Sequence, residues 1–266
     1  MSVLANGNSR AIKNGNPELQ SFSRFFEHWL VEQNKYLQNL ISVSTKPEKH
    51  NLRPLLNGVI RHYEQYYEAK SRCAKQDVLG MLTPSWTSTL EDAFMWIGGW
   101  RPTMAFHLLY SKSGLQLEAQ LANLIAGLST CDLADLSPSQ LTQLDQLQRR
   151  TIREERGITE KMAKHQETVA DHSMVELSHM VTECTGGTVD GLDNRVELAL
   201  ASKEEVLEEI LHKADDLRLR TLKAILDVFT PIQAVHFLIA AAELHLRVHD
   251  WGMNKDATQR PGRGQN

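Results

Sequence analysis

Cysteine is scarce in this sequence and long apolar runs are absent, and each absence excludes a class of protein. The three cysteines, Cys73, Cys131 and Cys184, lie far apart and form no Cys-x-x-Cys motif. A disulfide framework is therefore not expected, and free thiols indicate a reducing compartment. The longest apolar run, residues 237–242, is far shorter than the roughly 20 residues of a membrane-spanning helix, and the amino end shows no signal-peptide pattern.

The sequence also has too few clustered basic residues for a nucleic-acid-binding protein. Lysine and arginine number 29 against 33 acidic residues, which gives a net charge of −4, and no basic block occurs along the chain. We therefore expect no direct contact with nucleic acid. With 41% hydrophobic residues, the chain can bury one large core. Together these features predict one domain without a membrane anchor, located in the nucleus and cytoplasm.

Apolar residues recur at spacings of three and four residues, which is the period of an α-helix, and almost no segment alternates as a strand does. Four expected helix starts carry a capping box, a Ser or Thr followed three residues later by Glu or Gln. They begin at Ser88, Ser137, Ser202 and Thr230. We predict an all-α fold of about seven helices, one of them long, at residues 17–43, 48–80, 88–97, 102–126, 138–180, 203–228 and 231–251.

These helices are expected to form a single multi-helix domain over residues 18–252. Segments 1–17 and 253–266 are rich in Gly, Asn and charged residues, so both are predicted to be disordered. Residues 182–194 contain three glycines and are expected to be a surface connection. The long helix carries a half-apolar stripe, which is compatible with a homodimer.

The last predicted helix places His245 and His249 four residues apart, on one face and about 5–6 Å apart at Cβ. Their face is apolar, so burial would keep both imidazoles neutral and able to bind a metal. Two interpretations follow: histidines hydrogen-bonded within the core, or a ligand site. The polar arc of the same helix is expected to contain Gln233, His236, Glu243, Arg247 and Asp250.

Aromatic residues gather around two glycines and an Arg-Pro pair in LEDAFMWIGGWRPTMAFHLLY, residues 90–110. One interpretation is a buried helix corner, in which the glycines end one helix at positive φ and Pro102 starts the next. The other is an aromatic-lined pocket for an apolar ligand. No phosphate-loop motif surrounds Gly98 and Gly99.

Two further patterns indicate helix faces exposed to solvent. His165, His172 and His179 fit a solvated stripe better than a pH-sensitive seam. The charged run 203–223 is expected to face solvent with ion pairs four residues apart. It turns four apolar residues inward: Val206, Ile210, Leu217 and Leu222. No Ser-His-Asp, Cys-His or paired-carboxylate motif stands out in the sequence, so an enzyme is not expected.

Five segments, in order along the chain, resemble the plant Delay of Germination family. They are FEHWL around Trp29, TPSWTSTLEDAFMWIGGWRPT from Thr83, LSPSQLTQLDQLQ from Leu136, KADDLRLRTLKAIL from Lys213 and LHLRVHDWG from Leu244. The resemblance therefore extends over residues 18–252. The same domain is similar to the carboxy-terminal half of TGA-type bZIP transcription factors, but no basic region or leucine zipper precedes Trp29.

This resemblance implies a non-enzymatic plant regulator of seed dormancy and abscisic-acid signalling, with type 2C protein phosphatases as partners. The implied partner-binding residues are Phe26 and Trp29. Because the segment SRFFEHW lacks the acidic residue that the family carries shortly before this Trp, we expect the phosphatase contact to be weakened or redirected. The alternative is a transcriptional cofactor that joins bZIP-type transcription factors.

The resemblance also implies haem as a cofactor, with His245 and His249 as the candidate ligands. Two side chains on one face of one helix cannot occupy opposite axial positions of the same iron. At most one of the two histidines would therefore be the direct ligand, and the other would support it.

Overall fold

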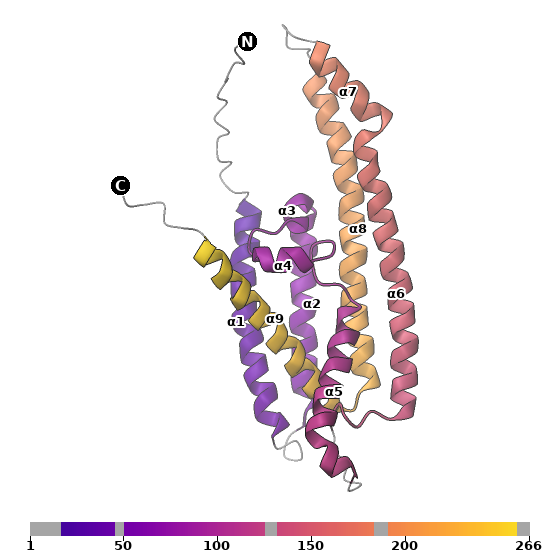
Figure 1. Ribbon diagram of the computed structural model, residues 1–266. Helices are drawn as coiled ribbons and strands as arrows, with labels where there is room; N and C mark the ends of the chain where they lie inside the picture. Colours follow the sequence, from indigo (N-terminus) through magenta and orange to yellow (C-terminus); the bar gives the residue numbers. More distant parts are fainter. Residues whose placement is uncertain (1–16, 46–50, 126–131, 184–190, 260–266) are drawn as a thin grey trace, which may run out of the picture.

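The structure, a computed structural model, describes residues 17–45, 51–125, 132–183 and 191–259. Within these ranges every regular element is a helix, which confirms the predicted all-α fold. Figure 1 shows the helices side by side, with α6, α7 and the start of α8 extending beyond the others at one end. In chain order the elements are α1 (Pro17–Ser44), α2 (Arg53–Ala74), α3 (Val78–Leu82), α4 (Thr89–Phe94), α5 (Met104–Ile125), α6 (Pro138–Glu167), the 3-10 helix η2 (Thr168–Ala170), α7 (His172–Glu183), α8 (Leu192–Val228) and α9 (Pro231–Gln259).

Three of the four predicted capping boxes start helices. At Ser88 and Ser137 the serine oxygen accepts from the backbone three residues on, and the Glu or Gln side chain accepts from the serine N–H. Thr230 makes the same exchange at the start of α9. The prediction at Ser202 is wrong, because α8 begins at Leu192 and continues through this position. A Ser-x-x-Glu pattern inside a helix has no free amides to satisfy.

The long helix predicted at 138–180 is interrupted. It ends at Glu167, passes through η2 and resumes as α7, because the Asp171 carboxylate accepts from the Met174 N–H and starts a new helix. Lys203 of α8 fixes this corner by donating to the Thr168 carbonyl at 2.7 Å and to Asp171 at 2.8 Å. The inner face of α6 packs along α8. That face is therefore covered within the chain, and the homodimer stays a prediction.

Other boundaries also differ from the prediction. The helix expected at 48–80 is divided into α2 and α3, because Asp77 accepts from the Gly80 N–H and starts a new helix. The expected connection at 182–194 is shorter, since α7 runs to Glu183 and α8 begins at Leu192. Residues 253–259, predicted to be disordered, are the last turns of α9. The predictions for residues 1–16 and 260–266, and two of the three cysteines, lie outside the described residues.

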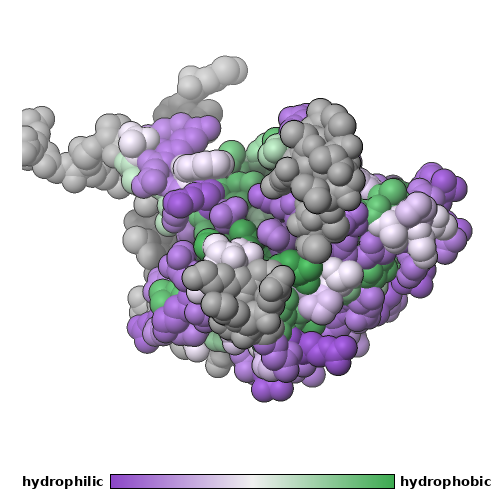
Figure 2. Space-filling view, turned by 90° about the horizontal axis from the view of Figure 1, so that it is seen from below, coloured by the Kyte–Doolittle hydropathy of each residue, from purple (hydrophilic) through white to green (hydrophobic). Residues whose placement is uncertain are grey.

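Two clusters of buried apolar side chains hold the helices together. The larger joins α1, α2, α5, α6, α8 and α9 around residues such as Phe106, Leu144 and Phe237. The smaller joins α1, α2, α3 and α8 around Phe22 and Met81. Seen from below, hydrophobic residues gather near the centre of the molecule and hydrophilic ones surround them (Figure 2). None of the helices in the described ranges combines the length and apolar character needed to cross a membrane.

Candidate functional site

A cavity of about 790 Å³ lies between α2, α4, α5, α8 and α9, and Phe26 and Trp29 of α1 also line it. This volume is in the range of ligand-binding cavities, which are about 300–1,000 Å³ and mostly apolar. Aromatic side chains form much of the wall, among them Trp29, Tyr66, Trp86, Trp100 and Phe237. The predicted aromatic pocket therefore exists, although it includes more of the chain than residues 90–110.

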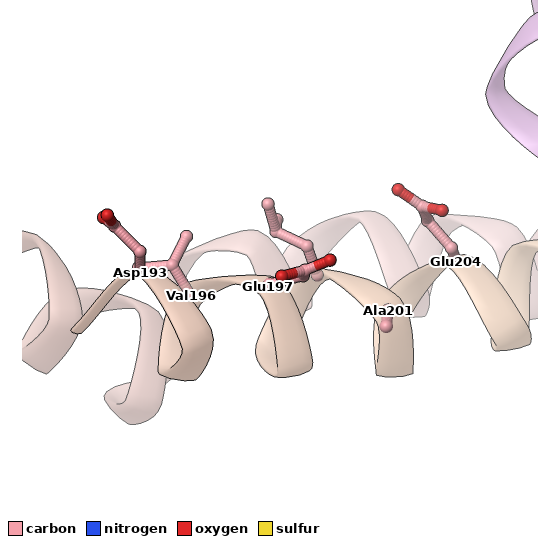
Figure 3. Close-up of a pocket in the computed structure, with 6 residues that line it drawn as sticks. Asp193, Val196, Glu197, Ala201 and Glu204 are labelled. Carbon is pink, nitrogen blue, oxygen red and sulfur yellow. The ribbon is translucent and has the colours of Figure 1, made fainter. Parts of the chain in front are cut away.

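A second hollow runs along α8 alone (Figure 3). Asp193, Val196 and Glu204 project from one side of this single helix, and no other described element contributes to its lining. Sites that bind small ligands usually surround them with several elements. The cavity between the helices is therefore the candidate functional site.

The loop between α4 and α5 forms one side of the cavity. Ile97 and Gly98 both have positive φ, at 48° and 64°, and a Cβ on Gly98 would lie 2.6 Å from the Met81 carbonyl oxygen. Only glycine fits at this close approach. The predicted corner is confirmed as a bend between two helices, but its details differ, because α4 ends at Phe94, before the glycines, and α5 begins at Met104, after Pro102. The positive φ values belong to Ile97 and Gly98, and a Cβ on Gly99 would lie 3.0 Å from the Arg218 guanidinium carbon.

Three charged side chains are buried beside this loop: Lys70, Asp215 and Arg218, with 1%, 7% and 7% exposure. Asp215 accepts hydrogen bonds from both Lys70 and Arg218. Lys70 also donates to the Gly98 carbonyl at 2.7 Å, and Arg218 donates to the carbonyls of Trp96, Ile97 and Trp100. Burial lowers the pKa of Lys70 to about 8. The cluster fixes the loop to α2 and α8.

The sequence interpretation missed these charges because it assigned residues 203–223 to a solvated face. Ion pairs expected there do form, between Glu209 and Lys213 and between Asp216 and Arg220. Asp215 and Arg218 nevertheless face inward. Spacings of four and three residues relate Leu211, Asp215, Arg218, Leu222 and Ile225, which is the pattern of one inward helix face. That spacing was the signal that could have located the buried pair.

His245 lies on the cavity wall between two tryptophans. Its ring centroid is 5.6 Å from that of Trp29 and 6.5 Å from that of Trp100. Burial lowers the pKa of His245 to about 4, so its imidazole is neutral at physiological pH. The described hydrogen bonds that stabilise the fold do not use this ring. His245 is therefore the histidine of the predicted pair that the cavity can reach.

His249 has a different environment. Its Nδ1 donates to Glu91 Oε2 of α4 at 3.0 Å, and this hydrogen bond raises the pKa of His249. Burial alone would raise the pKa of Glu91, but hydrogen bonds from His249 and Ser88 outweigh it and the pKa is lowered. Both changes favour an imidazolium paired with a carboxylate. His249 is not among the side chains that line the cavity.

The end of α9 docks on the start of α4 through three contacts. Besides the Glu91–His249 pair, Asp256 accepts from the Thr89 N–H at 2.8 Å, and Gly252 packs against Ser88. The carboxylate at the amino end of α4 also suits the helix dipole. The segment LHLRVHDWG therefore serves to join two helices that are far apart in sequence.

Phe26 and Trp29, the predicted partner-binding residues, are buried, at 3% and 4% exposure. The ring centroid of Phe26 is 5.8 Å from that of His249, and the centroid of Trp29 is 5.6 Å from that of His245. The four predicted site residues therefore form one packed cluster, of which Phe26, Trp29 and His245 line the cavity. A surface role for the Phe26 and Trp29 side chains is not what the structure shows.

Other residues that the sequence singled out lie elsewhere. His172 and His179 are exposed, as a solvated stripe requires, whereas half-buried His165 donates to the Lys203 carbonyl at 2.9 Å. The predicted polar arc of α9 is wrong at Gln233, which is 4% exposed and bonds to Gln140 and to the Asp135 carbonyl. A side-chain amide can be buried where all its partners are supplied.

The cavity matches haem in part. It offers flat apolar faces and, at His245, a neutral imidazole that can reach its interior. His249 does not fit as a second ligand, since its side chain does not line the cavity. The buried cations that would meet haem propionates, Lys70 and Arg218, already donate to Asp215 and to backbone carbonyls. In the described part of the chain, no group of three or more His, Cys, Asp or Glu residues could hold a metal ion.

Comparison with known proteins identifies the relatives of this chain. A family model described as DOG1, seed dormancy control, matches residues 33–111. Protein DOG1-like 3 of Arabidopsis thaliana is 32% identical over 237 residues, which cover 85% of this chain and 82% of that protein. Protein RESPONSE TO ABA AND SALT 1 is 25% identical over 87% of the chain and 94% of its own length.

A transcription factor of the same plant is also similar. Transcription factor TGA2 of Arabidopsis thaliana is 27% identical over 250 residues, which cover 94% of this chain and 66% of TGA2. The identity to DOG1-like 3 is higher than the identity to TGA2. The chain belongs to the DOG1-like family of plant regulatory proteins.

Proposed function

We propose that this chain is a non-enzymatic regulator of seed dormancy and abscisic-acid signalling that acts by binding protein partners. The observation that supports it most is the 32% identity with DOG1-like 3 over most of both chains. The cavity is consistent with a regulator: Glu91 stands between Ser88 and His249, so the imidazole contacts a carboxylate and not the hydroxyl. A nucleophilic triad has the opposite order, with histidine between the other two groups.

The partner in this proposal is a type 2C protein phosphatase. Because Phe26 and Trp29 are buried, a partner would contact the outer face of α1, where the side chain of Val31 is 57% exposed. Apolar side chains at the centre of an interface often carry much of its binding energy. The protein would meet this partner in the nucleus and cytoplasm.

A second candidate function is a transcriptional cofactor that joins bZIP-type factors. The similarity to TGA2 over 94% of this chain favours it. In this case the helical domain would bind a DNA-bound bZIP protein and make no DNA contact itself, in keeping with the net charge of −4. Phosphatase and bZIP protein are therefore the two partners to compare.

Capture by the immobilised full chain distinguishes the two functions. We expect it to retain a type 2C phosphatase, and Val31→Glu to weaken that retention about tenfold by placing a charge in the interface. Val175→Glu on α7 is the matched control, because Val175 is also 57% exposed and lies at the far end of the molecule. It should leave retention unchanged.

Two results would contradict the phosphatase proposal. Retention of a bZIP protein on its duplex, with no phosphatase retained, supports the cofactor function. Equal losses for the two glutamate variants would exclude α1 as the contact surface. Duplex alone at about 150 mM salt serves as the blank, and we expect none to be retained.

Haem binding is a further part of this proposal, with His245 as the only direct ligand. We expect haemin to give a saturable Soret shift that His245→Ala abolishes and His249→Ala largely keeps, since His245 lines the cavity and His249 does not. Circular dichroism should first show that both variants retain their helicity. A shift that is lost only in His249→Ala, or one that never saturates, would contradict haem ligation by His245.

A further inference from the structure

One buried acceptor beside the cavity has no described partner. The Glu91 side chain is 1% exposed, and its Oε2 accepts three hydrogen bonds, from Ser88 N, Ser88 Oγ and His249 Nδ1. Its other oxygen, Oε1, is buried and makes no hydrogen bond with any described residue. Buried carboxylate oxygens without a donor are rare because desolvation is not compensated. Glu91 is also one of the residues that line the cavity.

The cationic side chains of the cavity, unlike Glu91 Oε1, already have hydrogen-bond partners. Lys70 and Arg218 share Asp215 and donate to four backbone carbonyls of the α4–α5 loop. Arg101, nearer the surface, pairs with Glu155 at 2.7 Å. An anionic head group would therefore compete with bonds that already hold the loop. A ligand group that donates a hydrogen bond, in contrast, could bond to Glu91 Oε1.

The remaining side chains that line the cavity favour a ligand that is largely apolar. Tryptophan, tyrosine and phenylalanine rings surround the space, and its volume of about 790 Å³ accommodates a molecule of several fused or linked rings. Apolar side chains also stand at the opening, where Phe94 is 62% and Leu244 is 43% exposed. Large apolar side chains exposed beside a cavity are typical of a ligand entrance.

We propose that this cavity binds a small, uncharged, aromatic or polycyclic molecule whose single hydroxyl or N–H group donates to Glu91 Oε1. The proposal names a ligand class for the regulator proposed above and rests on that function only for its biological consequence. Glu91 belongs to α4 and holds α9 through His249. A ligand bound there would therefore contact the junction between these two helices.

Three naphthalenes that differ in one substituent test the donor. We expect 2-naphthol to bind saturably, and at least about tenfold more tightly than 2-methoxynaphthalene, which keeps the ring and lacks the donor. The anion 2-naphthoate should bind more weakly than 2-naphthol as well. Fluorescence titration of the full chain at neutral pH measures all three affinities.

Two variants assign the effect to the cavity. Glu91→Gln keeps a capping-box residue. Its single amide oxygen would take the place of Oε2, which accepts from Ser88 and His249, so an NH2 donor would replace the free acceptor Oε1, and the gap between naphthol and methoxynaphthalene should fall to about threefold or less. Ala241→Phe fills the cavity from α9 and should abolish binding of all three probes. Ala257→Phe is its control, because Ala257 is exposed on the same helix and does not line the cavity.

Equal affinity for naphthol and methoxynaphthalene in the wild type would overturn the proposal. So would a preference for naphthoate, which would indicate an acid-binding cavity, or binding of haemin alone. Retained binding in Ala241→Phe would also overturn it by moving the probes to another surface. Phosphatase capture does not involve Glu91, so failure of the proposed function and failure of this ligand class give separate results.

Discussion

Replacing Asp215 with alanine should lower the free energy of unfolding by about 4 kcal/mol. The substitution leaves Lys70 and Arg218 buried at 1% and 7% exposure without the carboxylate that both contact. Removing one partner from a buried ion network typically costs about 3–5 kcal/mol, because the remaining charge stays buried without an opposite charge to offset its desolvation. Chemical denaturation followed by circular dichroism at neutral pH measures this difference.

The neighbouring residue provides the control. Asp216 pairs with Arg220 on the exposed face, and each of these side chains is 50% exposed, so Asp216→Ala should cost less than about 1 kcal/mol. If both variants lost similar stability, the buried cluster would not hold the α4–α5 loop. Adding Lys70→Met to Asp215→Ala should recover part of the loss, since it removes one of the two unpaired cations.

Replacing Gly252 with alanine should destabilise the protein by about 3 kcal/mol. A Cβ at this position would lie 2.5 Å from Ser88 Cβ and closer still to Ser88 Oγ. Ser88 cannot easily yield, because it is fully buried and both its N–H and its hydroxyl bond to Glu91. Overpacking of a tight contact costs about 1–3 kcal/mol, and this one also disrupts a capping box.

Gly157→Ala is the matched control for this prediction. Gly157 lies within α6, and a Cβ there would meet no atom within 4 Å. Alanine should stabilise that helix by about 0.5–1 kcal/mol through its higher helix propensity. A Gly252→Ala variant that unfolds at the same denaturant concentration as wild type would show that α9 does not dock closely on α4. The substitution should also reduce any ligand response that depends on Glu91.

Local signals made most of the helices predictable. The capping boxes at Ser88, Ser137 and Thr230 each act within four residues of the chain, so reading them needs no knowledge of neighbouring helices. Boundaries that depend on distant residues were predicted wrongly. The corner at η2 depends on Lys203, a side chain more than thirty positions further along the chain. The division between α2 and α3, in contrast, depends on a local signal that the sequence interpretation missed, because Asp77 accepts from the Gly80 N–H three residues on.

The candidate site shows the same division. Sequence spacing placed His245 and His249 on one helix face, but it could not separate them: the difference is that Glu91, 158 positions away, bonds to one and tryptophans enclose the other. The aromatic residues around Gly98 were recognisable as a group. Their enclosure of a cavity depends on α2, α8 and α9.

The sequence by itself determined the all-α class, most helix positions and the family, because hydrophobic period, capping residues and segment order are properties of the chain alone. Only the tertiary structure decided that Phe26 and Trp29 are buried and that Asp215 and Arg218 face inward. It also decided that Glu91, beside a cavity, has an oxygen with no hydrogen-bond partner among the residues that the structure describes. Burial and hydrogen-bond partners depend on contacts between helices that are far apart in the sequence. Short-range sequence patterns carry no information on which helices pack together.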